Sequence, residues 1–214
     1  MQNMARVKTS PPSWRTLSAR FTDERDCLAS FLALESAEII AGIKPGNLVN
    51  VTNRLRPCGR TPYLLWHAHG AELLAETGLE GLVLRDRGDS LLLYLYKPAL
   101  LQELLLRTPV ATILRHCHYP EPADLTATLA QLKERLTDAT FPHEIGIFLG
   151  YPLKDVLAFM GRIRLPFACQ GPWKVYGKPE QSLELADRYR HCRCRMAMRL
   201  QECADPVACL REAA

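Results

Sequence analysis

The residues best suited to chemistry gather in the segment FPHEIGIFLGYP, where His143 and Glu144 precede an apolar run that ends on Gly150. Neighbouring side chains on a strand point to opposite faces, so spacing alone does not make these two residues a catalytic dyad. His143 could still act as an acid, a base or a ligand. In the structural alternative, His143 hydrogen-bonds a loop backbone and Glu144 is solvated or paired with a lysine.

The same segment predicts a strand from Glu144 to Leu149, a glycine turn, and a helix that opens at Tyr151. Because the amides at a helix N-terminus attract negative charge, we expect a small anionic ligand or cofactor at this strand-to-helix junction. The predicted ligand-binding residues are Lys44, His143, Glu144, Tyr151, Cys169, Lys174 and Tyr176. No dinucleotide fingerprint or P-loop lysine is present, so nucleotide sites of those kinds are not expected, and the sequence identifies no cofactor.

A second hypothesis is an enzyme. Cys169 lies in a Gly-Pro turn close to Trp173 and Lys174, where a cation could lower the pKa of the thiol and make it reactive. Cys169 and His143 could then support thiol-redox or other catalysis. A packed loop thiol is the structural alternative for Cys169.

The remaining hypothesis is a metal-binding or nucleic-acid-binding module. The sequence contains HAH, HCH and HCRC clusters, but Cys117 and Cys192 continue apolar helical stripes and are interpreted as core thiols. His191 and Cys194 could share a metal, yet no second C-x-x-C completes a ligand framework, so no metal site is predicted. Arginines at 188, 195 and 199 form a stripe that acidic residues interrupt, which favours a solvated face over a nucleic-acid site.

The composition of the chain limits which of these hypotheses are reasonable. The chain has 214 residues, of which 48% are hydrophobic, and a formal net charge of +4 that does not demand a polyanionic partner. We find no signal-peptide core and no apolar stretch long enough to span a membrane, so we expect a cytoplasmic protein whose eight cysteines are reduced. The oligomeric state does not follow from the sequence. We expect a flexible tail over residues 1–20, one domain over residues 21–200, and a second tail over residues 201–214.

Helix and strand signals alternate along that domain. Thr22 is the expected cap of a helix that ends at Gly42, a strand follows from Leu48 to Thr52, and a second helix begins near Pro62. A hairpin is predicted between Gly81 and Tyr96, and both faces of its second strand are apolar, which is typical of a central strand. Helical stripes follow near residues 110–117, 125–136 and 151–160, then a strand at 173–176 and a helix from Pro179. The predicted fold class is α/β, a mixed sheet with helices packed on it in an α/β sandwich.

Two further segments carry a resemblance to a known family. FPHEIGIFLGYPLKDVLAFM followed by CQGPWKVYGKPEQSLELADRYRHC resembles the carboxyl-terminal signature of the domain-of-unknown-function family 3793, and AGIKPGNLVNV resembles its amino-terminal segment. This is a family of bacterial proteins found largely in anaerobes. The resemblance implies no activity and supplies no catalytic residues. It implies that the family's pattern includes these residues: Lys44, His143, Glu144, Tyr151, Trp173, Lys174 and Tyr176.

Overall fold

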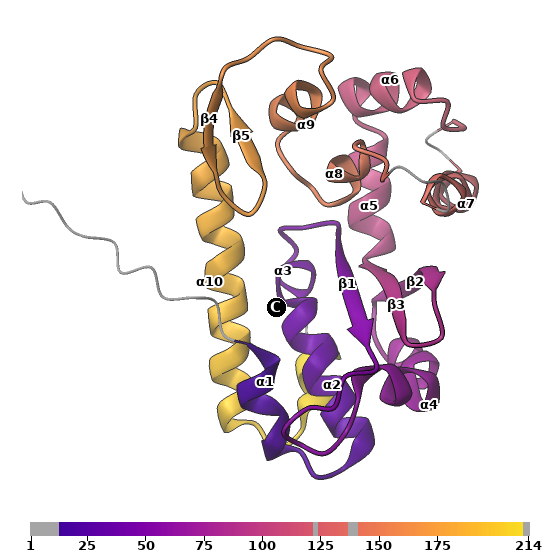
Figure 1. Cartoon of the computed structure of the whole chain (residues 1–214), viewed down its shortest axis with the longest axis vertical. Coiled ribbons are helices and arrows are strands. Elements are labelled where there is room, and N and C mark those ends of the chain that lie inside the picture. Colours follow the sequence, from indigo (N-terminus) through magenta and orange to yellow (C-terminus); the bar gives the residue numbers. More distant parts are fainter. Residues whose placement is uncertain (1–12, 122–123, 137–140, 212–214) are drawn as a thin grey trace, which may run out of the picture.

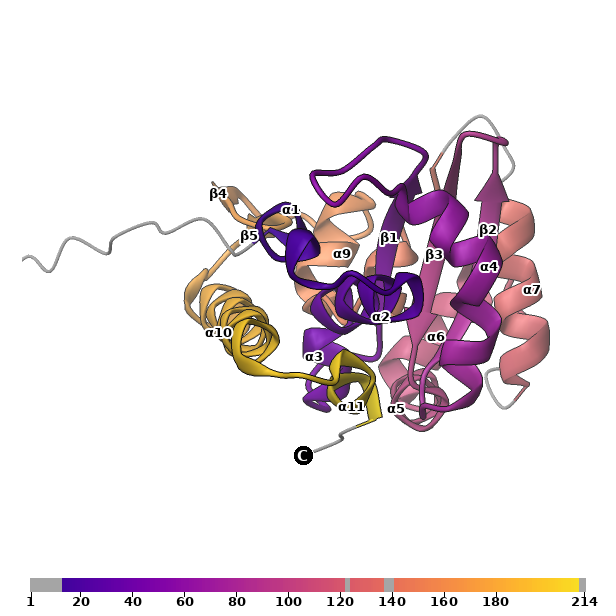
Figure 2. The same cartoon turned by 90° about the horizontal axis from the view of Figure 1, so that it is seen from below.

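A computed structural model describes residues 13–121, 124–136 and 141–211. Its centre is a three-stranded antiparallel sheet in the order β1 (Gly46–Thr52), β3 (Ser90–Tyr96), β2 (Glu80–Asp86), with helices on both faces (Figures 1 and 2). The single α/β domain with helices packed on a sheet is therefore confirmed. The pairing differs from the prediction, because both strand pairs of this sheet are antiparallel rather than mixed.

The hairpin and the central strand are confirmed. β2 and β3 form the predicted hairpin, whose turn contains Gly88 at φ +84°. β3 pairs with β1 on its other side, with Val49 opposite Leu93. Its odd-numbered leucines pack into one core and Tyr94 and Tyr96 into the other, so the strand separates two hydrophobic cores.

The first core lies between the sheet and helices from both ends of the chain. It contains α2 (Glu24–Glu35), α3 (Ala37–Ile40), α4 (Pro62–Ala75), part of α10 (Glu180–Glu202), and α11 (Pro206–Arg211). The predicted helix over 22–42 is interrupted at Ser36, and its cap is Asp23 rather than Thr22, since the Asp23 carboxylate accepts from the Asp26 amide at 3.0 Å. The second helix begins at Pro62 as predicted.

The second core covers the opposite face of the sheet. It contains α5 (Pro98–Leu105), α6 (Thr108–His116), α7 (Leu125–Arg135), α8 (Ile145–Phe148) and α9 (Leu153–Phe159). The predicted strand over 144–149 is wrong, because residues 145–148 form α8. An apolar run buried on all sides has no periodicity that separates a strand from a short helix. The Tyr94 hydroxyl, which donates to the Phe148 carbonyl at 2.8 Å, fixes this helix over the sheet.

A small hairpin completes the fold beside the long helix α10 (Figure 1). β5 (Lys174–Tyr176) matches the predicted strand, whereas its partner β4 (Phe167–Gln170) was not predicted. β4 is almost wholly exposed and follows no alternating pattern, so its sequence carries no strand signal.

Both ends of the described chain differ from the expected tails. Trp14 and Leu17 of α1 (Trp14–Leu17) are buried in the first core, and the short 3₁₀ helix η1 (Ser18–Arg20) follows directly. At the other end, Val207 and Leu210 of α11 are buried in the same core. Residues 13–20 and 201–211 therefore belong to the packed domain, while residues 1–12 and 212–214 lie outside the described residues.

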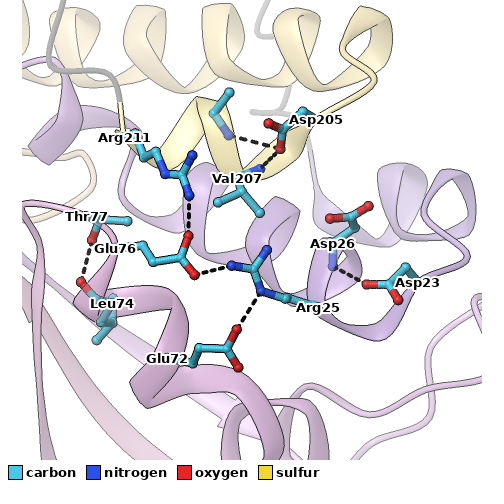
Figure 3. Close-up of polar contacts among 11 residues, drawn as sticks. Asp23, Arg25, Asp26, Glu72, Leu74, Glu76, Thr77, Asp205, Val207 and Arg211 are labelled. Carbon is cyan, nitrogen blue, oxygen red and sulfur yellow. Dashed lines mark hydrogen bonds and ion pairs between the residues drawn. The ribbon is translucent and has the colours of Figure 1, made fainter.

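Ion pairs tie α11 to the body of the molecule. Arg25 of α2 pairs with Glu72 of α4 at 3.0 Å and with Glu76, the residue that caps the C-terminus of α4, and Glu76 also accepts from Arg211 of α11 (Figure 3). One carboxylate thus joins three helices. Beside it, the Asp205 carboxylate caps α11 by accepting from the Val207 amide at 2.9 Å (Figure 3).

Candidate functional site

The predicted glycine turn is present and fixes the position of Tyr151. Gly150 has φ +67°, its amide donates to the Ile147 carbonyl at 2.8 Å, and the Tyr151 amide donates to the Gly146 carbonyl at 2.9 Å. This is the hydrogen-bond pattern of a Schellman motif that ends α8. The Tyr189 hydroxyl of α10 donates to the Gly150 carbonyl at 3.0 Å, so the turn also positions a second tyrosine.

An aromatic wall extends from this turn. The rings of Tyr151 and Trp173 are stacked, with centroids 4.5 Å apart and an interplanar angle of 23°, and the Tyr189 ring lies 6.1 Å from Trp173. These three residues come from the loop before α9, the loop before β5, and α10. Stacking therefore joins segments that are distant in sequence.

Asp155 holds the wall in place. Its buried carboxylate accepts from the Trp173 indole at 2.9 Å, from the Ser182 hydroxyl at 2.6 Å and from the Tyr176 amide at 2.9 Å, and it pairs with Lys154 at 2.8 Å. Burial alone would raise the pKa of Asp155, but the hydrogen bonds outweigh it and hold the pKa below its ordinary value. The ionised Asp155 carboxylate thus connects α9, β5 and α10 through hydrogen bonds.

Lys44 lies buried against this wall. Its ammonium is 5.0 Å from the centre of the Tyr189 ring and 5.7 Å from that of Tyr151, which is cation–π geometry. It donates to the Asn47 side-chain oxygen at 2.9 Å, and the Asn47 amide in turn donates to the Glu35 carbonyl at 2.8 Å. An ammonium has three donors, and the hydrogen bonds of the described residues account for one of them.

A second buried charge faces the same space. Glu38 of α3 is only 5% exposed, and its Oε2 atom has no hydrogen-bond partner among the described residues. Burial raises the pKa of Glu38, an effect that the Lys44 charge partly offsets. Burial lowers the pKa of Lys44 to about 8, although the negative charge of Glu38 acts to raise it. Burial therefore favours the uncharged form of both side chains, compared with the same groups in water.

These residues line a cavity of about 700 Å³, which we call the Lys44 cavity. Its walls include Phe31, Glu38, Lys44, Tyr151, Trp173 and Tyr189. Its other basic side chains are Arg15, Arg56, Arg190 and Arg193, of which Arg193 pairs with Glu35 at 2.5 Å and Arg190 with Asp187 at 3.1 Å. The cavity can thus offer a buried cation, a buried carboxyl group and aromatic faces to one small molecule.

A second cavity of about 440 Å³, the His143 cavity, adjoins the aromatic wall, because Tyr151 and Trp173 line both cavities. His143 and Lys174 lie at this second cavity, each against the Phe159 ring, with the His143 ring centroid 4.7 Å away and the Lys174 ammonium 5.3 Å away. Both side chains are exposed.

A family model described as "Protein of unknown function (DUF3793)" matches residues 32–209. The chain belongs to this family. The DUF3793 match runs from within α2 to within α11 and includes Lys44, Tyr151, Trp173 and Tyr189. A search of the curated proteins found no match, and neither did a search of the solved structures. The description of DUF3793 names no activity.

The structure divides the seven predicted site residues among different places. Lys44 and Tyr151 line the Lys44 cavity, and His143 and Lys174 join Tyr151 at the His143 cavity. Glu144 points elsewhere, because its buried carboxylate accepts from Arg135 at 2.5 Å and from the Tyr119 hydroxyl at 3.2 Å. The structural alternative for Glu144, pairing with a basic residue, is therefore observed, although the base is an arginine.

Tyr176 and Cys169 lie on the small hairpin. The Tyr176 ring packs edge-on against Phe167 at 6.0 Å, and its amide is the group that binds Asp155. Cys169 is half-buried and packs beside the cluster of Trp173, Val175 and Tyr189. Neither residue is among those that line the two cavities.

The expected strand-to-helix junction is also corrected. The turn connects α8 to α9, two helices, and Asp155 already occupies the first turn of α9. A carboxylate at that end opposes the binding of a second anion there. A buried positive group that the structure places at a cavity here is the Lys44 side chain.

Within the described parts of the chain, no three His, Cys, Asp or Glu side chains come together as a metal-binding group. Cys117 and Cys192 are buried as core thiols, as their helical phases predicted. No helix in the described residues is long and apolar enough to cross a membrane.

The sequence reasoning missed Glu38 and Tyr189. In the sequence, Glu38 follows Phe31 and Leu34 at helical spacing within the helix predicted over residues 22–42, and a charged residue on that apolar stripe was the signal that could have found it. Tyr189 was interpreted as part of an apolar helical stripe and as a possible stacking residue beside the arginines of the last helix, but its place beside Lys44 and Gly150 arises only from tertiary packing.

Proposed function

We propose that this protein binds a small anionic organic molecule in the Lys44 cavity, with Lys44 as its counter-ion. The observation that carries the proposal is a buried ammonium with one hydrogen-bond acceptor among the described residues, facing a cavity large enough for a small ligand. A lysine is rarely buried without a carboxylate or other anion paired to it, since removing the charge from water costs several kcal/mol. A bound anion would supply that partner.

Glu38 refines the ligand's chemistry. Because burial raises the pKa of Glu38, its protonated form is accessible closer to neutral pH, and a protonated carboxyl group can donate to a ligand oxygen. A ligand carboxylate or phosphate could then accept from both Lys44 and Glu38. The stacked Tyr151 and Trp173 rings suit a planar or apolar ligand body.

Benzoate is a suitable probe, because it combines a carboxylate with an aromatic ring, and benzamide is its neutral match. We expect saturable binding of benzoate by isothermal titration calorimetry, with weaker binding of benzamide. Lys44→Met should weaken benzoate binding about tenfold to a hundredfold, the loss expected for one charged hydrogen bond of about 1.5–3 kcal/mol.

Lys174→Met is the matched control, because Lys174 is an exposed lysine at the His143 cavity. It should leave benzoate affinity within about twofold of the wild type. If Lys174→Met abolished binding and Lys44→Met did not, the ligand would occupy the His143 cavity instead. Equal binding of benzoate and benzamide would contradict the role of charge.

A further inference from the structure

Two cysteines distant in sequence meet at the edge of the first core. Cys27 lies on α2 and Cys58 lies in the loop between β1 and α4, and their sulfur atoms are 3.8 Å apart. Both are free thiols. Cys27 is fully buried, whereas Cys58 is partly exposed, so a small reagent can reach the pair only through Cys58.

The loop around Cys58 is a tight turn that is anchored beside α2. The Arg56 amide donates to the Arg60 carbonyl and the Gly59 amide to the Arg56 carbonyl, both at 2.9 Å, and Gly59 has φ +74° with open space around it. Arg60 also binds the Thr22 carbonyl just before α2. A disulfide bond is about 2 Å long, so the sulfurs need to approach by about 1.8 Å, which side-chain rotation and a small shift of the turn can supply.

We propose that Cys27 and Cys58 form a reversible disulfide that ties this loop to α2, with a small disulfide such as glutathione disulfide as the oxidant. The Cys58 thiolate attacks one sulfur of glutathione disulfide, the S–S bond breaks, and one glutathione thiolate leaves. Cys27 then attacks the Cys58 sulfur and expels the second glutathione thiolate. The protons lost by the two cysteines are taken up by the two glutathiones, so two thiols are oxidised and one disulfide is reduced.

The order of these steps follows from the environment of the two thiols. Burial raises the pKa of Cys27 to about 12, so Cys27 is a poor first nucleophile and acts on a mixed disulfide already formed at Cys58. The second step should accelerate as the pH rises, because only the Cys27 thiolate attacks.

The disulfide would affect the wall of the Lys44 cavity. Arg56 belongs to the same turn as Cys58 and lines that cavity, where its Nε atom is buried without a partner among the described residues. Fixing the turn to α2 would restrict where this guanidinium can move. The chemistry of the cysteine pair does not depend on any ligand.

The test treats the full-length folded protein with glutathione disulfide, blocks the remaining thiols with iodoacetamide, and maps peptides by mass spectrometry. We expect one cross-linked peptide pair containing Cys27 and Cys58, its reversal by dithiothreitol, and a melting temperature higher by about 5 °C or more in the oxidised protein. Cys27→Ser should stop the reaction at a glutathione adduct on Cys58. Cys58→Ser should leave Cys27 unmodified, and Cys203→Ser should cross-link like the wild type.

Two results would overturn the proposal. One is a wild-type protein in which Cys58 carries glutathione and Cys27 remains alkylatable after unfolding. The other is a folded protein in which neither cysteine reacts. Because Cys58 lies on a surface loop, the Cys58→Ser comparison stays informative even if Cys27→Ser does not fold.

Discussion

Lys44 and Glu38 are two charged residues held at buried positions beside one cavity. Each is about 95% buried, and burial moves the pKa of each toward the neutral form, lowering that of Lys44 to about 8. No ion pair within 4.0 Å joins the two among the described residues, so their charges only partly compensate each other. Buried polar groups that weaken a fold are typical of sites kept for function.

Removing both buried charges together should not weaken the fold. The double variant Lys44→Met/Glu38→Gln should unfold at equal or higher urea concentration than the wild type, with a gain of up to about 4 kcal/mol, because apolar or neutral groups need no hydration. Benzoate binding should be lost in the same protein. Chemical denaturation followed by circular dichroism measures the stability.

A structural role for the pair predicts the opposite result. If Lys44 and Glu38 chiefly hold α3 against β1, the double variant should lose about 3 kcal/mol or more. Lys174→Met, at an exposed position, should stay within about 0.5 kcal/mol of the wild type and shows what a lysine-to-methionine change does by itself.

Gly150 is the other residue whose identity the site requires. Gly150→Ala should destabilise the protein by about 2–4 kcal/mol, because an alanine at φ +67° is strained and its Cβ would lie 2.6 Å from the Pro45 ring. Gly161→Ala is the matched control. Gly161 has φ +72° and nothing lies within 4 Å of the position that an added Cβ would take, so this substitution introduces the backbone strain without a steric contact. Equal losses in the two variants would show that the contact with Pro45 is unimportant.

At the scale of elements, the arrangement of α9, β5 and α10 depends on one carboxylate. Asp155→Asn should destabilise the protein by about 3 kcal/mol, because an amide nitrogen would face groups that all donate hydrogen bonds. The exposed Glu184→Gln on α10 should change stability by less than about 0.5 kcal/mol. Thermal unfolding of the three proteins measures the difference.

The pH dependence of that difference has a defined sign. The pKa of Asp155 is lowered in the folded state, so its contribution is present above the unfolded value of 3.8 and is lost as the pH falls through the folded pKa. Wild type and Asp155→Asn should therefore converge in stability in strong acid. A stability difference between the two proteins that stays constant from pH 7 down to pH 2 would contradict a role for the ionised Asp155 carboxylate.

The elements that a sequence predicts well here are those with a local signal. The hairpin has a glycine turn between two apolar strands, and the cap of α8 has Gly150 after an apolar run. The strand predicted over 144–149 failed because burial on all sides erases periodicity. The Lys44 cavity could not be predicted as a whole, since Lys44 meets Tyr151 and Tyr189 only through tertiary packing.

At the scale of the whole molecule, the last helix closes the first core. Leu210 is 2% exposed among residues of α2, and Arg211 beside it joins the carboxylate that bridges α2 and α4 (Figure 3). Leu210→Ala should therefore cost about 2–5 kcal/mol, the range for a leucine removed from a packed core. The exposed Met198→Ala on α10 should cost less than about 1 kcal/mol, and urea denaturation distinguishes them. A loss below 1 kcal/mol for Leu210→Ala would mean that α11 is not part of the cooperative unit.

The most direct test of the central claim is the titration of the Lys44 side chain by NMR, with and without saturating benzoate. Free Lys44 should titrate near pH 8, well below its ordinary 10.5, because burial disfavours its charge. Bound benzoate favours the ammonium, so it should raise this pKa, and its affinity should fall above about pH 8. Benzamide should leave the titration unchanged. A Lys44 that titrates near 10.5, or whose titration benzoate does not move, would contradict an anion site at this lysine.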